Sequence, residues 1–147
     1  MTPFGIHVDA PADKVFALMS DFPNAPDRIS SIKRIEMLTS GPVGVGTKFK
    51  ETRVMFGKEA TETMEVVEFV PPKTYTLFSL SCGVEFTVKL RCVPEGSGSN
   101  LSWECETKPV TLVGKLFSPI GKLMMGMMMK KCVMKDLADI KRVAEGK

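Results

Sequence analysis

The spacing of hydrophobic and polar positions changes along the chain. Between residues 32 and 108, apolar and polar side chains mostly alternate, which is the period of a strand with one covered face. From Pro119 to Val143, apolar side chains recur at intervals of three and four, which predicts a long helix. A short strand at 4–8 and two short helices, one opened by Pro11 and one over 24–29, are expected before the alternating region.

Turn residues divide the alternating region into separate strands. Together with the first strand, the expected strands are 4–8, 32–38, 47–56, 59–69, 74–80, 84–93 and 100–108. Successive strands joined by short turns form an antiparallel sheet, and alternation requires that one face be covered. Only the C-terminal helix is long and apolar enough to cover it. The pattern therefore predicts one α+β domain over residues 1–147, in which a curved antiparallel sheet of about seven strands wraps around the helix.

The C-terminal helix is rich in methionine. Five of the 11 methionines lie between Met124 and Met129. Methionine is flexible and polarizable, so it fills irregular space and adapts to apolar ligands. The helix therefore either fills the inside of the sheet or closes one side of an apolar cavity. Its expected apolar face consists of Ile120, Leu123, Met124, Met127, Met128, Met134, Leu137, Ile140 and Ala144.

Composition and charge argue against several classes of protein. The net charge of +3 is too small, and the basic residues are too scattered, for nucleic-acid binding. Lysines interrupt the apolar helix, so stable membrane insertion is not expected. The four cysteines have no C-x-x-C spacing and the N-terminus lacks a secretory pattern, which favours reduced thiols and a cytoplasmic location. Monomer and homodimer both stay open.

Four short motifs resemble those of a known superfamily. They are Ala10–Leu18 (APADKVFAL), Gly44–Phe49 (GVGTKF), Val66–Pro72 (VVEFVPP) and Gly98–Trp103 (GSNLSW). With the order of the elements, they make nearly the full chain similar to the START-like, or polyketide cyclase/dehydrase (SRPBCC, Bet v 1-like), superfamily. The resemblance implies a helix-grip fold with a deep cavity that binds lipids, polyketides, hormones or other hydrophobic small molecules. The superfamily also contains cyclases and subunits of larger assemblies, so the fold alone selects no function.

Two charged residues are candidates for chemistry inside such a cavity. If Phe49 faces the cavity, period two places Glu51 and Arg53 on the same face. The opposite register would turn Lys48 and Lys50 inward, which is the less favourable arrangement. Opposite charges in an apolar pocket have to be paired, or have to orient the polar end of a ligand.

The remaining polar candidates are weaker. Tyr75, the only tyrosine, is either a hydroxyl donor to a ligand or a general acid, or else a core or rim residue. His7, the only histidine, lies opposite Ile6 and Val8 on its strand and is expected at the surface. Glu62 is expected on a solvated edge. Without further histidines or paired cysteines, no metal site and no cofactor are expected, and no catalytic residue is assigned.

Three functions are compatible with these residues. The first is a non-catalytic carrier or sensor whose partner is a hydrophobic small molecule or lipid. The second is a lyase of the polyketide cyclase/dehydratase type that uses Glu51, Arg53 or Tyr75. The third is an interaction subunit with a filled interior. The residues expected to bind a ligand are Phe16, Phe49, Glu51, Arg53, Tyr75, Phe86, Val88, Trp103, Phe117, Met124 and Met128.

Overall fold

Seven strands form one antiparallel sheet in the computed structural model, which describes residues 4–55, 57–81, 83–109 and 119–146. The strands lie in the order β1-β7-β6-β5-β4-β3-β2. Their bounds are β1 Phe4–Val8, β2 Ile32–Met37, β3 Lys48–Met55, β4 Lys58–Val70, β5 Thr74–Ser81, β6 Val84–Glu95 and β7 Gly98–Pro109. Strands β2 to β7 are a meander of chain neighbours, and β1 extends the sheet by pairing with β7.

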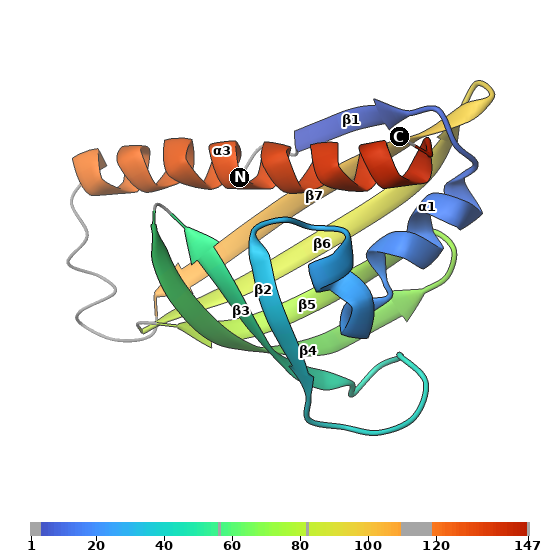
Figure 1. Cartoon of the computed structure of the whole chain (residues 1–147). Coiled ribbons are helices and arrows are strands. Elements are labelled where there is room, and N and C mark those ends of the chain that lie inside the picture. Colours follow the sequence, from blue (N-terminus) through green and yellow to red (C-terminus); the bar gives the residue numbers. More distant parts are fainter. Residues whose placement is uncertain (1–3, 56, 82, 110–118, 147) are drawn as a thin grey trace.

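The helices lie on the inner side of the curved sheet (Figure 1). Helix α3 (Pro119–Ala144) runs across the sheet and contacts β1 and α1. Helix α1 (Ala12–Met19) and the 3-10 helix η1 (Phe22–Asp27) lie at one end of the sheet, near the C-terminal end of α3. This arrangement confirms the predicted α+β helix-grip fold.

The predicted elements agree closely with the observed ones. The first strand matches at both ends, and α3 runs one residue beyond the predicted Val143. The short helix expected at 24–29 is instead a 3-10 helix at Phe22–Asp27 with Pro26 inside it. Proline lacks the N–H group that a longer α-helix would need at that position.

The predicted covered face of α3 is wrong at Met127, whose exposed fraction is 67%. Among the side chains of α3 that the structure describes, the buried ones are Val133, Leu137, Ile140 and Ala144, at helical spacing. A run of consecutive methionines offers an apolar side chain in nearly every direction, so its composition does not show which side meets the sheet. In the described part of the chain, no helix combines the length and the apolarity needed to cross a membrane.

Aromatic rings fill the end of the sheet where α1 and η1 lie. The ring of Phe16 lies 5.7 Å from that of Phe69 and 6.0 Å from that of Tyr75, measured between centroids. The ring of Phe22 stacks on Phe49 at 4.7 Å. Such ring pairs add about 0.5–1.5 kcal/mol each beyond the burial of their area. This end of the interior is therefore densely packed.

Candidate functional site

A cavity of about 990 Å³ lies between the inner face of the sheet and α3, beside the aromatic core. Sites for small molecules usually enclose roughly 300–1,000 Å³ and are mostly apolar. The apolar residues that line this cavity include Ile29, Ile35, Leu77, Leu90, Trp103 and Val133. Its size and lining therefore suit an apolar ligand.

Strand alternation builds the floor of the cavity. Phe86, Val88 and Leu90 are every second residue of β6, so all three turn to the same face and line the cavity. In the sheet, Val88 lies opposite Leu77 of β5 and Cys105 of β7. Side chains directly opposite on neighbouring strands touch, so such rows form a continuous apolar surface.

A network of three paired charged side chains interrupts this apolar wall. Arg53 of β3 donates a hydrogen bond from Nε to Oε1 of Glu51 at 2.7 Å, and another from Nη1 to Oδ2 of Asp136 at 2.9 Å. The side-chain exposed fractions are 19% for Arg53, 12% for Glu51 and 19% for Asp136. Pairing offsets part of the cost of removing these charges from water. The network also joins the sheet to α3.

Burial and pairing act on the ionisation of this network in opposite directions. Burial by itself lowers the pKa of Arg53, but the charges of Glu51 and Asp136 more than offset this, so its pKa lies above the ordinary value and it stays cationic. Burial raises the pKa of Asp136, and the charge of Arg53 opposes that rise only in part. Oδ1 of Asp136 is buried and has no hydrogen-bond partner among the described residues. Asp136 is thus the least satisfied member of the network.

The structure brings six of the predicted ligand-binding residues to the cavity. They are Glu51, Arg53, Tyr75, Phe86, Val88 and Trp103. The favoured register of β3 is confirmed, because Lys48 and Lys50 are exposed on the other face. Contact between these residues and a ligand stays a prediction.

Phe16 and Phe49 do not line the cavity. Their exposed fractions are 3% and 0%, and each packs against another aromatic ring in the core. Alternation correctly turns both side chains inward. It does not show whether an inward side chain meets another side chain or empty space, because the neighbour comes from a distant part of the chain.

Tyr75 is a core residue whose ring also borders the cavity. Its hydroxyl donates a hydrogen bond to the backbone oxygen of Met19 at 3.1 Å, and the residue is 4% exposed. Burial raises the pKa of Tyr75 well above its ordinary value. The core alternative is therefore the one observed, and the interpretation of Tyr75 as a hydroxyl donor to a ligand or a general acid is not supported.

Three predicted site residues cannot be placed at the cavity. Phe117 lies outside the described residues. Met124 and Met128 belong to α3, but their side chains are outside the described part of the chain. Their contribution to the site stays a prediction.

Asp136 and Glu62 line the cavity although neither was a predicted site residue. Asp136 stands three residues after Val133 and directly before Leu137, so helical spacing already placed it on the buried face of α3. Glu62 was expected on a solvated edge, but it lines the cavity, and its Oε2 accepts a hydrogen bond from Ser79 Oγ at 3.1 Å. In both cases the periodic spacing of the element turned a carboxylate toward the interior, and this could have identified the residue as part of the cavity.

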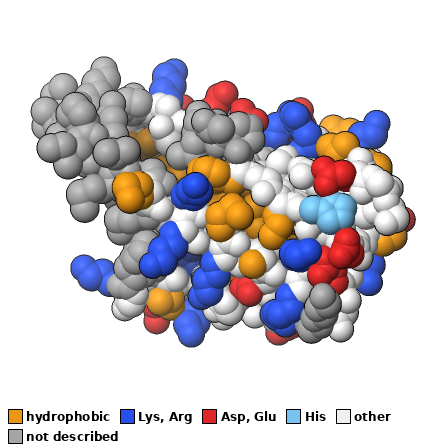
Figure 2. Space-filling view, turned by 90° about the horizontal axis from the view of Figure 1, so that it is seen from above, with side chains coloured by type: hydrophobic (Ala, Val, Ile, Leu, Met, Phe, Trp, Pro, Cys, Tyr) orange, Lys and Arg blue, Asp and Glu red, His pale blue; other side chains and the backbone are white. Residues whose placement is uncertain are grey.

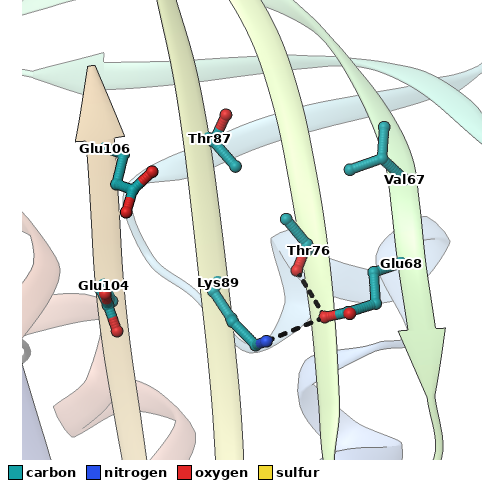
Figure 3. A pocket seen from close by; sticks show the side chains of 7 residues that line it. All are labelled: Val67, Glu68, Thr76, Thr87, Lys89, Glu104 and Glu106. Carbon is teal, nitrogen blue, oxygen red and sulfur yellow. Dashed lines mark hydrogen bonds and ion pairs between the residues drawn. The ribbon is translucent and has the colours of Figure 1, made fainter. Parts of the chain in front are cut away.

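A second hollow of about 360 Å³ lies on the outer face of the sheet (Figure 3). Its lining consists of Val67, Glu68, Thr76, Thr87, Lys89, Glu104 and Glu106. Within it, Glu68 accepts a hydrogen bond from Thr76 at 3.0 Å and pairs with Lys89 at 3.1 Å. All of these side chains but Val67 are polar, so the hollow lacks the apolar enclosure of a ligand site.

His7 is a surface residue, as the sequence predicts. It lies among acidic side chains (Figure 2), with Nδ1 2.6 Å from Glu95 Oε1 and Nε2 3.0 Å from Asp9 Oδ1. The hydrogen bond to Glu95, together with that to Asp9, raises the pKa of His7 despite an opposing effect of desolvation. Among the residues that the structure describes, no three His, Cys, Asp or Glu side chains are grouped so that they would hold a metal ion.

Comparison with solved structures supports the fold. The Zhui aromatase/cyclase from Streptomyces sp. R1128 is 18% identical, with a TM-score of 0.76 over 98% of this chain and 92% of that one. A START superfamily protein from Mycobacterium smegmatis is 15% identical, with a TM-score of 0.76 over 98% and 96% of the two chains. Ginseng major latex-like protein 151 from Panax ginseng is 10% identical, with a TM-score of 0.78 over 97% and 95%. At such identities the likeness concerns the fold alone.

The sequence comparisons identify the family. No curated protein matches the chain. Residues 5–145, however, match the family described as polyketide cyclase / dehydrase and lipid transport. This match includes every strand and helix that surrounds the cavity, apart from the first residue of β1. The chain therefore belongs to the polyketide cyclase / dehydrase and lipid transport family.

Proposed function

We propose that residues 1–147 act as one START-like domain that binds a hydrophobic small molecule or lipid beneath α3, as a carrier or sensor without catalysis. The cavity of about 990 Å³ with its apolar floor is the observation that carries this proposal. Burial of apolar ligand surface contributes roughly 25 cal/mol per Å². Such a cavity therefore binds an apolar compound tightly with few polar contacts.

The polar groups of the cavity support binding better than catalysis. Arg53 is held by two carboxylates, and the hydroxyl of Tyr75 is held by a backbone oxygen. A general acid or base has to reach the proton that it transfers. Groups already engaged with the protein are poorly placed to transfer a proton, so binding by the apolar surface is the better supported function.

A reaction of the cyclase/dehydratase type is the second candidate. The family includes polyketide cyclases, and Glu51 and Arg53 lie in the cavity. Turnover of a polyketide-like substrate that is lost in Glu51→Gln without loss of folding would support it. The third interpretation required a filled interior, whereas the structure contains the cavity, so we do not propose an interaction subunit.

Binding of the neutral dye Nile red, followed by fluorescence, tests the proposal. Val88 lies in the middle of the cavity floor, so Val88→Trp fills space and should weaken binding at least about tenfold. The control is Thr87→Trp at the neighbouring position of β6, which places the same ring on the outer face. This variant should bind Nile red like the wild type. Folding of each variant is checked by circular dichroism, and Val88→Phe replaces Val88→Trp if the latter does not fold. A wild-type protein that binds no dye, or a cavity variant that binds it unchanged, contradicts the proposal.

A further inference from the structure

We infer that the cavity selects amphiphiles whose head group donates hydrogen bonds and carries no negative charge, an alcohol or a protonated amine, over carboxylates of the same chain length. The inference rests on the proposed function, because it presupposes an apolar ligand in this cavity. It is carried by the acidic cluster, which consists of the cavity-lining side chains of Glu51, Glu62 and Asp136; Glu51 and Asp136 bond Arg53, and Glu62 lies opposite Glu51.

The acidic cluster makes the described cavity wall negative in a protein whose net charge is +3. The carboxyl groups of Glu51 and Asp136 bond the guanidinium group of Arg53, and that of Glu62, beside Glu51, has no cationic partner among the described residues. At the rim, Lys58 and Glu59 contribute one charge of each sign. Without the charge of Asp136, Glu51 and Glu62 still stand against Arg53 as the only cation of this inner part of the described wall. A negative head group would therefore enter a region of like charge, where low polarity strengthens repulsion.

The guanidinium group of Arg53 is already engaged on two sides. Its Nε bonds Glu51 at 2.7 Å and its Nη1 bonds Asp136 at 2.9 Å. A ligand carboxylate that bound Arg53 through these atoms would displace one of the two acids. The displaced carboxylate would then be buried without a counter-charge, which costs several kcal/mol.

The sheet itself holds two like charges together. Glu51 of β3 and Glu62 of β4 are direct cross-strand partners on the inner face. Like charges in such a pair are destabilising. Ser79 donates a hydrogen bond to Glu62 but brings no positive charge, and Arg53 lies opposite Ala60. A head group that donates hydrogen bonds or carries positive charge would relieve this repulsion.

Asp136 supplies an unused acceptor at the same place. Its Oδ2 receives the bond from Arg53, and its Oδ1 is buried without a partner among the described residues. An unsatisfied buried acceptor is destabilising. After a rotation of the carboxyl group, an O–H or N–H of a ligand would remove that cost, whereas a carboxylate has no proton to donate.

The test is displacement of Nile red at pH 7 by decan-1-ol, decylamine and sodium decanoate, which share one chain length. We expect the alcohol and the amine to displace the dye at concentrations at least about tenfold lower than decanoate. Equal or stronger displacement by decanoate overturns the inference while the proposed function stands. Failure of Nile red to bind at all removes both.

Charge-neutralising variants locate the selectivity. The measured quantity is the concentration of decanoate that displaces Nile red divided by the concentration of decylamine that does so. Asp136→Asn should reduce this ratio at least about threefold. The control Glu106→Gln removes the same charge from the outer face and should leave the ratio unchanged. Glu62→Gln retains an acceptor for Ser79 and serves as the second cavity variant if Asp136→Asn does not fold. A ratio unchanged in a folded cavity variant, or lowered equally by Glu106→Gln, overturns the assignment to the acidic cluster.

Discussion

Arg53 joins the two sides of the cavity. It pairs with Glu51 of its own strand and with Asp136 of α3, so it connects β3 to the helix. Removing one partner of a buried ion pair costs more than the pair contributes, because the remaining charge stays buried. Replacing Arg53 should therefore destabilise the protein mainly because Glu51 and Asp136 would be left without a counter-charge.

Arg53→Met should lower the free energy of unfolding by about 3 kcal/mol at pH 7, since it leaves two acids unpaired in a partly dry site. Urea unfolding measures this loss. The matched control is Arg34→Met on β2, where the side chain is 69% exposed and lies 3.9 Å from Glu59. The control should change stability by less than about 0.5 kcal/mol. Equal losses in the two variants would show that the network is not stabilising.

His7 should titrate above its ordinary value of 6.5, because Glu95 and Asp9 favour the protonated ring. A raised pKa in the folded state means that the contribution of His7 to stability is fully present below about 6.5 and is lost as the pH rises through the raised pKa. The ring-proton chemical shifts of His7 followed by NMR against pH give the value directly. Glu95→Gln should lower it, and a titration at or below 6.5 in the wild type contradicts the assignment.

Helix α3 presents different surfaces along its length. Its C-terminal part buries Leu137 and Ile140, which also border the cavity, and Met129, Cys132 and Asp136 border the cavity as well. Met127, by contrast, points to solvent. One helix therefore anchors the fold at one end and covers the cavity in its middle.

Leu137→Ala should lower the free energy of unfolding by about 2–5 kcal/mol, because the leucine is 2% exposed and its loss leaves a void. Met127→Ala on the same helix should change it by less than about 0.5 kcal/mol, since this side chain is 67% exposed. Chemical unfolding of both variants compares the two positions. A larger loss of unfolding free energy in Met127→Ala than in Leu137→Ala would indicate that Met127 is buried, as the sequence pattern predicts.

At the scale of the whole molecule, the interior is divided into a packed end and a hollow end. The rings of Phe16, Phe22 and Phe49 fill the space beneath α1 and η1. Beyond them, the sheet and α3 are separated by the cavity and connected by the Arg53 network. The packed end provides stability, which allows the other end to enclose space.

A ligand in the cavity should therefore couple the sheet to the helix. Decylamine at about 100 times its dissociation constant should stabilise the protein by about 2.7 kcal/mol. Hydrogen exchange should slow in β6 and in residues 129–140 together, because both line the cavity. Val88→Trp, with its filled cavity, serves as the control and should show neither effect. Slower exchange that leaves residues 129–140 unchanged would place the ligand outside the cavity.

Local spacing alone determined the elements, their order and, at most strand positions, the direction in which side chains point. The alternation of Phe86, Val88 and Leu90 and the inward register of Glu51 and Arg53 are properties of single strands, so they could be predicted from the sequence. The tertiary structure decided that Phe16 and Phe49 meet other rings, that the Tyr75 hydroxyl bonds Met19, and that Asp136 reaches Arg53. The tertiary structure also contains a cavity, whereas the sequence allowed either a filled interior or a hollow one. The physical reason is that empty space and charge pairing depend on side chains from segments far apart in the chain, which no local period records.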